Sequence, residues 1–167
     1  MGQGRDFVIE GDEYDSAFFD KTAKFLKYLP DIAVVNNVEF DHADIYDDMR
    51  AINTAFERFV RLVPRRGLVL IGGDSPAALA LAERAVSRVQ TFGTGEGFDW
   101  QAHDLTADAT TTRFQVRRGG LPFGEFEVPL LGAHNVRNAL AAIAVATEVG
   151  IDDVRIREAL RRFAGVK

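Results

Sequence analysis

The sequence contains no cysteine among its 167 residues, which excludes disulfide bonds and thiolate-bound metals and fits a reducing, cytoplasmic setting. Long apolar runs are also missing, since no stretch approaches the roughly 18 consecutive apolar residues of a membrane-spanning helix. Residues 1–6 are not followed by the apolar segment of a signal peptide. We therefore expect a protein with neither a membrane anchor nor an export signal.

Positive charge is scarce relative to negative charge. The 20 Lys and Arg residues are outnumbered by 25 Asp and Glu residues, which gives a formal net charge of −5 and a pI near 5.2. Because nucleic acids are bound through basic surfaces, DNA and RNA are disfavoured as partners. The content of 47% hydrophobic and 27% charged residues is typical of one globular domain with a hydrophobic core.

Short apolar runs alternate with helical patterns in the first half of the sequence. The runs predict buried strands at residues 7–9, 32–35 and 68–71, and a further strand is predicted at 89–92. Apolar residues at three- and four-residue spacing predict a helix over 47–62, and Ser75 followed by Pro76 predicts the start of another that runs to about residue 86. The stretch 16–28 fits neither state. Helices that join successive strands indicate an α/β fold with a parallel sheet.

The second half begins with a different pattern. Between about residues 98 and 130, apolar residues alternate with polar ones around Gly119 and Gly120, which predicts a small antiparallel β meander. Two helices are then predicted, over 135–149 and 152–163. The predicted fold class is therefore α/β, a parallel sheet with a small antiparallel meander.

Acidic residues are concentrated directly after the first predicted strand. Glu10, Asp12, Glu13 and Asp15 place four carboxylates within six residues. Ligands of parallel α/β sheets bind at the carboxyl ends of the strands. Mg²⁺ takes oxygen ligands from one or two carboxylates together with substrate phosphates. The cluster is a candidate metal site, and a solvated acidic turn is an equally weighted alternative.

A second polar cluster follows the next predicted strand. It contains Asn37, Asp41 and His42, and it should lie at the same edge of the sheet as the acidic cluster. A histidine beside an aspartate can bind a metal, hold a phosphate oxygen or act as a base, although most isolated Asp-His pairs do none of these. The convergence of two polar clusters on one edge favours a functional site.

A third cluster stands at the start of the helix predicted over 135–149. It contains His134, Asn135 and Asn138. The two asparagines are three residues apart, so their amides share a helix face and could contact the donor and acceptor edge of a purine. Asn135 as an ordinary N-cap is the alternative, and the spacing alone favours that alternative.

Three other features are interpreted as structural. The glycine-rich residues 93–97 lack the lysine of a phosphate-binding loop and precede strand-like residues, so we interpret them as a flexible connector. His103 lies in the predicted meander without a matching partner. Trp100, the only tryptophan, is expected in the core.

The three clusters, in this order and spacing, resemble the Mur ligase family of ATP-dependent ligases. The segment Gly132-x-His134-Asn135-x-x-Asn138-x-Leu140-Ala141-Ala142 is similar to the family signature whose two asparagines contact adenine. The resemblance implies that ATP is bound by His134, Asn135 and Asn138. It implies that Mg²⁺ is bound by Glu10 and His42, with Asp12, Glu13, Asn37 and Asp41 as further groups near the metal or the substrate.

Within this family, residues 10–21 and 39–48 are most similar to the branch that recycles murein peptide. That branch joins the tripeptide L-alanyl-γ-D-glutamyl-meso-diaminopimelate to UDP-N-acetylmuramate through an acyl phosphate. The branch that adds L-alanine to UDP-N-acetylmuramate is the nearest alternative, and folylpolyglutamate synthase is a more distant one. An alternative of another class is a non-catalytic binding module that keeps the fold.

Two devices of the family have no match in this sequence. The P-loop Gly-x-Gly-Lys-[Ser/Thr] is absent, and no lysine occurs between Lys27 and Lys167 that could be carbamylated. We expect residues 1–167 to be part of the ATP-binding domain, with the P-loop and a UDP-sugar domain upstream and a third domain downstream. We expect no ligase turnover from this chain alone, and self-association through an uncovered strand edge.

Overall fold

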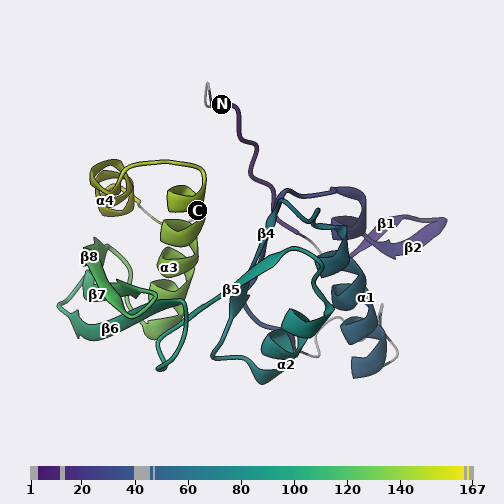
Figure 1. Ribbon diagram of the computed structural model, residues 1–167, viewed down its shortest axis with the longest axis horizontal. Coiled ribbons are helices and arrows are strands. Elements are labelled where there is room, and N and C mark those ends of the chain that lie inside the picture. Colours follow the sequence, from purple (N-terminus) through teal and green to yellow (C-terminus); the bar gives the residue numbers. More distant parts are fainter. Residues whose placement is uncertain (1–3, 12–13, 40–45, 47, 164, 166–167) are drawn as a thin grey trace.

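A six-stranded sheet organises the protein (Figure 1). The computed structural model describes residues 4–11, 14–39, 46, 48–163 and 165. In spatial order the strands are β3 (Ile32–Val35), β4 (Leu68–Gly72), β5 (Arg88–Gly93), β6 (Trp100–Ala107), β7 (Thr112–Arg118) and β8 (Leu121–Val128). Neighbours are parallel from β3 to β6 and antiparallel from β6 to β8. The predicted fold class is confirmed, and the meander continues the parallel sheet.

Strand β4 lies between two hydrophobic cores. All five of its residues are buried, as expected for a central parallel strand that is covered on both faces. Leu68 and Leu70 belong to the core shared with β6, β7, β8 and the C-terminal helices. Val69 and Ile71 point to the opposite face and belong to the other core. The alternation of side chains along one strand thus separates the two cores.

Helices α1 (Met49–Leu62) and α2 (Pro76–Leu79) cover one face of the sheet (Figure 1). Asp48 caps α1 by accepting a hydrogen bond from the Ala51 N–H, and Ser75 caps α2 by accepting one from the Ala78 N–H. Both predicted helix starts are confirmed within one or two residues. The second helix is shorter than predicted, because it continues after Leu79 as the 3₁₀ helix η2 (Ala80–Arg84).

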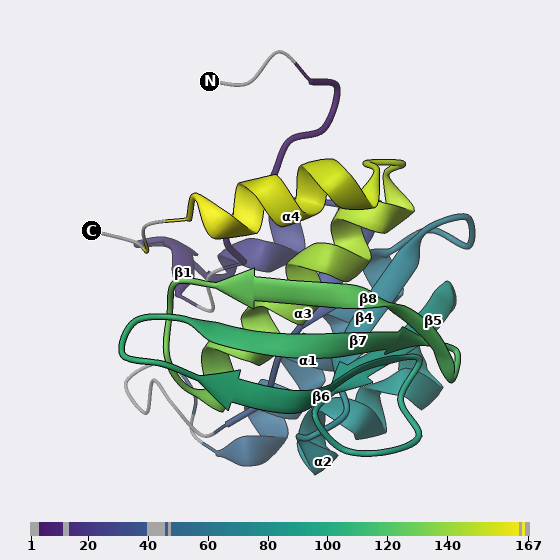
Figure 2. The ribbon, with the colours of Figure 1, turned by 90° about the vertical axis from the view of Figure 1, so that its left-hand side faces the viewer.

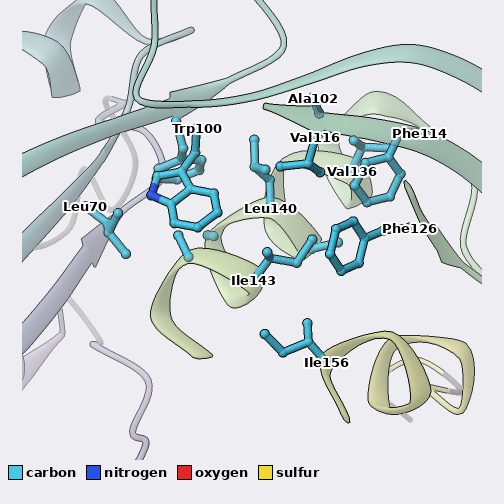
Figure 3. Packing of buried hydrophobic residues seen from close by; sticks show 14 of the residues in the cluster. Leu70, Trp100, Ala102, Phe114, Val116, Phe126, Val136, Leu140, Ile143 and Ile156 are labelled. Carbon is cyan, nitrogen blue, oxygen red and sulfur yellow. The ribbon is translucent and has the colours of Figure 1, made fainter. Parts of the chain in front are cut away.

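Helices α3 (Ala133–Glu148) and α4 (Asp153–Arg161) belong to the other core, where α3 packs behind the meander (Figure 2). Trp100, Phe114, Phe126, Leu140 and Ile143 meet there, each no more than 2% exposed (Figure 3). The Trp100 Nε1–H donates to Gln90 Oε1 at 3.0 Å, which satisfies the one polar atom of the buried indole. The predicted core position of Trp100 is confirmed.

No helix in the described part of the chain is long and apolar enough to cross a membrane.

The stretch 16–28, which the sequence pattern left open, forms a hairpin and one helical turn. These are β1 (Asp15–Ala17), β2 (Asp20–Ala23) and the 3₁₀ helix η1 (Lys24–Lys27). Phe25 of η1 is buried against Phe56 and Phe59 of α1, with ring centroids 5.2 and 4.8 Å away. A hydrogen bond from the Lys27 ammonium, with further ones from Thr22, lowers the pKa of Asp20 from 3.8 to about 2.

The predicted strand at residues 7–9 is wrong. The segment has no strand structure, and Phe7 and Val8 are 85% and 88% exposed. An apolar run becomes a buried strand only where a neighbouring strand offers its backbone groups and a core covers its side chains. In the part of the chain that the structure describes, no strand pairs with these residues.

Shortening a buried side chain of β4 should test the central position of the strand. We expect Leu70→Ala to lower the free energy of unfolding by about 2–5 kcal/mol, because the side chain is fully buried and its removal leaves a cavity. Leu121→Ala is the matched control, since Leu121 is 72% exposed and its loss should change stability by less than about 0.5 kcal/mol. Urea unfolding followed by tryptophan fluorescence measures both, and equal effects would contradict the assignment of β4 to the core.

Candidate functional site

Polar residues from four separate segments meet at the carboxyl edge of the parallel strands. Asn36 follows β3, Asp74 follows β4 and Thr94 follows β5. The Asn36 Nδ2 donates to Asn138 Oδ1 of α3 at 3.4 Å. Asp74 Oδ2 lies 3.9 Å from an Arg137 guanidinium nitrogen of the same helix. The first turns of α3 therefore lie over the edge at which parallel α/β sheets bind their ligands.

The start of α3 lacks a side-chain cap. Its N-cap, Gly132, has φ +97°, a conformation that favours glycine, and a Cβ there would come within 3.0 Å of the His134 ring. No side chain caps the helix and the first turn holds no acidic residue, so the positive pole of the helix dipole is not neutralised locally. His134 is exposed beside this helix start.

Asn135 is not the N-cap, so that alternative interpretation is wrong. The residue lies inside the first turn, and its side-chain Nδ2 donates to the Leu131 carbonyl at 2.8 Å. This bond leaves the Oδ1 of Asn135 as an acceptor. Asn138 is arranged the opposite way, because its Oδ1 is used by Asn36 and its Nδ2 is left as a donor.

These two amides match the edge of an adenine base. Within the described residues, neither Asn135 Oδ1 nor Asn138 Nδ2 has a hydrogen-bond partner. Three-residue spacing puts them on one face of α3. Adenine offers an exocyclic amino donor next to a ring-nitrogen acceptor, which a carbonyl and an amide N–H satisfy together. The residues present therefore fit an adenine ring.

The loop between β5 and β6 is held in place by one carboxylate. Asp74 Oδ2 accepts hydrogen bonds from the Thr94 backbone N–H at 3.0 Å and the Thr94 hydroxyl at 3.3 Å, and its Oδ1 accepts one from the Gly95 N–H at 3.3 Å. The interpretation of residues 93–97 as a flexible connector is therefore wrong for the part next to β5.

The Phe98 ring packs directly against the backbone of two glycines, Gly73 and Gly93. A Cβ at Gly73 would lie 2.2 Å from the Phe98 ring, and one at Gly93 would lie 2.7 Å from it. One residue further on, Asp99 Oδ2 accepts hydrogen bonds from the backbone N–H and the hydroxyl of Thr91, at 2.8 and 2.9 Å. Sequence reasoning missed these fixed contacts. Their signal was a polar residue within two positions of the end of each of the strands β4 and β5.

The structure describes only two of the six residues predicted to lie at or near the metal. Glu10 lies exposed in the extended N-terminal segment, and Asn37 is exposed just after β3. The other four residues of this prediction lie outside the described residues: Asp12, Glu13, Asp41 and His42. The described part of the chain contains no group of three or more His, Asp or Glu side chains that could hold a metal ion. The magnesium site stays a prediction.

His103 belongs to the meander and makes none of the contacts described above. It stands on β6, and its Nδ1 is 3.0 Å from the carboxylate of the adjacent Asp104. The structural role expected for His103 stays a prediction.

Comparison with known proteins decides the family. The model of the Mur ligase middle domain matches residues 4–146. The chain belongs to the Mur ligase family. The resemblance seen in the three polar clusters is thereby confirmed, and the matched range includes all the site residues discussed above.

Two curated relatives illustrate the range of similarity. The UDP-N-acetylmuramate–L-alanyl-γ-D-glutamyl-meso-2,6-diaminoheptandioate ligase of Escherichia coli K12 is 40% identical over 100% of this chain and 36% of its own length. The UDP-N-acetylmuramate–L-alanine ligase of Salinibacter ruber is 37% identical over 99% of this chain and 34% of its own length. The chain thus spans about a third of the length of the curated relatives it matches.

Among solved structures, the UDP-N-acetylmuramate:L-alanyl-γ-D-glutamyl-meso-diaminopimelate ligase from Neisseria meningitides has a similar fold. It superimposes with a TM-score of 0.85 at 44% sequence identity, over 96% of this chain and 48% of that chain. The sheet, the meander and the placement of α3 are therefore those of a Mur ligase middle domain.

The contact between Gly73 and Phe98 gives a direct test of the loop. We expect Gly73→Ala to destabilise the fold by about 1–3 kcal/mol, because the new methyl group overlaps the Phe98 ring. Adding Phe98→Ala should remove the overlap, so the double variant should be more stable than the two single losses predict. Gly4→Ala is the control, since nothing lies closer than 4.0 Å to its Cβ. Additive losses in urea unfolding would show that the two residues are not in contact.

Proposed function

We propose that this chain is the nucleotide-binding middle part of an ATP-dependent ligase that joins murein tripeptide to UDP-N-acetylmuramate. The observation that carries the proposal is the pair of amides at the start of α3, an acceptor on Asn135 and a donor on Asn138. They lie at the carboxyl edge of the sheet in a chain that is 40% identical to a ligase named for this reaction.

In this proposal the adenine ring of ATP is held by the side chains of α3. The Oδ1 of Asn135 accepts a hydrogen bond from the exocyclic amino group, and the Nδ2 of Asn138 donates one to a ring nitrogen. His134 borders the same open helix start. Guanine would present a carbonyl oxygen where adenine presents an amino group, so the same two amides would disfavour it.

The metal site completes the proposal. Glu10 and His42 would hold Mg²⁺, and Asp12, Glu13, Asn37 and Asp41 would surround the metal or the substrate. This part rests on the family resemblance. Bound Mg²⁺ would neutralise charge on the phosphates of ATP, which is the main requirement of phosphoryl transfer.

The complete ligase would carry out two substitutions. The carboxylate of UDP-N-acetylmuramate takes the γ-phosphoryl group from ATP and releases ADP, and the amino group of the tripeptide then displaces phosphate to form the amide. This sequence holds no P-loop, whose backbone amides and lysine bind phosphate in such enzymes. We propose that the P-loop and the other two domains belong to neighbouring segments of a longer, cytoplasmic enzyme, and that this chain alone binds ATP weakly.

A ligase that adds L-alanine is the second candidate. The observation that favours it is the 37% identity to the Salinibacter ruber enzyme, close to that of the murein ligases. The two candidates differ in the amine that is joined to UDP-N-acetylmuramate, which is the tripeptide or L-alanine, and share the nucleotide. Assaying ADP release by a full-length enzyme with tripeptide or with L-alanine, each with UDP-N-acetylmuramate, separates them.

Binding of the nucleotide tests both candidates against a non-catalytic module. We expect Mg²⁺-ATP titrated into the chain to bind weakly in calorimetry, and Asn138→Ala to weaken binding by about tenfold, because a base-specific hydrogen bond is worth about 1–3 kcal/mol. Asn53→Ala is the matched control, since Asn53 lies on α1 and no contact with the described site residues is found for it. Equal affinities of Asn138→Ala and the unaltered chain would contradict the adenine site.

Self-association is a separate part of the proposal. β3 stands at the end of the strand order, so its outer edge has no neighbouring strand in the described part of the chain. An open strand edge is a template for pairing with a second copy. We expect a concentration-dependent dimer in sedimentation velocity, and a monomer at all concentrations would contradict this expectation.

A further inference from the structure

We propose that Asp74 is a positioning residue of the nucleotide site, which fixes Arg137, and with it the amide-bearing first turns of α3, to the loop between β5 and β6. The inference rests on the proposed function, because it concerns how the amides of Asn135 and Asn138 are held for the base. The family signature does not include Asp74 or Arg137.

The Asp74 carboxylate is the meeting point of three segments. It follows β4, receives three hydrogen bonds from Thr94 and Gly95 of the β5–β6 loop, and faces Arg137 of α3. Its side chain is 20% exposed, and that of Arg137 is 42% exposed. A carboxylate that is largely shielded and fully used in this way has little freedom to turn, so it defines a fixed point for Arg137.

The glycines of the loop allow this close approach. A Cβ at Gly93 would come within 2.8 Å of Asp74 Oδ2, and one at Gly95 would come within 3.5 Å of Oδ1. A larger residue at position 93 would push the loop away from the carboxylate. The loop and the carboxylate are therefore matched to each other in shape.

The position of Arg137 affects the position of the two amides. It stands between Asn135 and Asn138 on α3, and Asp74 is its one ion-pair partner among the described residues. The start of α3 has no side-chain cap, and the Asn36–Asn138 hydrogen bond is long at 3.4 Å. The ion pair of Arg137 with Asp74, at 3.9 Å, is therefore a further contact between the helix start and the sheet edge.

A simpler role for Asp74 would be to cap the β5–β6 loop without any effect on α3. Three variants separate the roles. Asp74→Asn keeps a carbonyl oxygen for the Thr94 hydrogen bonds, loses the acceptor of the Gly95 N–H, and removes the charge that Arg137 faces. Arg137→Met removes the guanidinium and leaves the loop contacts intact, while Arg137→Lys keeps a positive charge.

The first experiment is calorimetric titration of Mg²⁺-ATP and of Mg²⁺-GTP into the unaltered chain and these variants. We expect Asp74→Asn and Arg137→Met each to weaken ATP binding by about threefold to tenfold and to reduce the preference for ATP over GTP. The double variant should be no weaker than the single ones, and Arg137→Lys should recover part of the affinity. Arg117→Met is the matched control, because it removes an equal charge from β7, where Arg117 has no ion pair among the described residues.

Unaltered affinity and base preference in Arg137→Met would overturn the proposal and leave Asp74 as a loop cap. Strictly additive losses in the double variant would also overturn it, because they would show that the two residues act separately.

A second measurement is independent of nucleotide. In ¹H–¹⁵N spectra of the free chain, Arg137→Met should shift the side-chain NH₂ signals of Asn135 and Asn138, and Arg117→Met should not. Absence of ATP binding to the unaltered chain would count against the proposed function, whereas unshifted amide signals would count against the positioning role.

Discussion

The burial of β4 on both faces is the constraint on which the rest of the structure depends. A strand can be covered on two sides only if every residue is apolar or small, and Leu68–Gly72 meets that condition. Helix α1 then packs on the side of Val69 and Ile71, and α3 on the side of Leu68 and Leu70. Because parallel neighbours β3 and β5 end level with β4, the polar residues that follow all three strands reach the same edge.

The chemistry of the site follows from this arrangement. Asn36, Asp74 and Thr94 are separated by long stretches of sequence, and each reaches the edge because its strand ends there. Helix α3 supplies the remaining groups, and the packing of Val136 and Leu140 in the core fixes which of its faces is left for a ligand. Asn135 and Asn138 lie on that remaining face, so the same helix serves the core with one side and the site with the other.

Much of this could be predicted from the sequence, for identifiable reasons. Strands β3 and β4 are continuous apolar runs, and α1 carries its core residues at helical spacing, so local patterns were sufficient there. The contacts of Asp74 could not be predicted, because they join residues 20 apart through a loop geometry that no periodicity encodes. The strand prediction for residues 7–9 failed for the opposite reason, since an apolar pattern alone does not supply a pairing partner. The hairpin at 15–23 combines exposed Phe18 and Phe19 with charged residues, which matches no simple pattern.

The division of the interior into two cores has a consequence for internal motion. Opening of the meander with α3 would disrupt one core, and opening of α1 with the hairpin would disrupt the other, whereas the amides of β4 stay protected until both have opened. Backbone hydrogen exchange should therefore be slowest in β4 and should divide the remaining protected amides into two groups with separate opening free energies. The proposed nucleotide site lies where these two groups meet, so a base bound there would slow exchange in both.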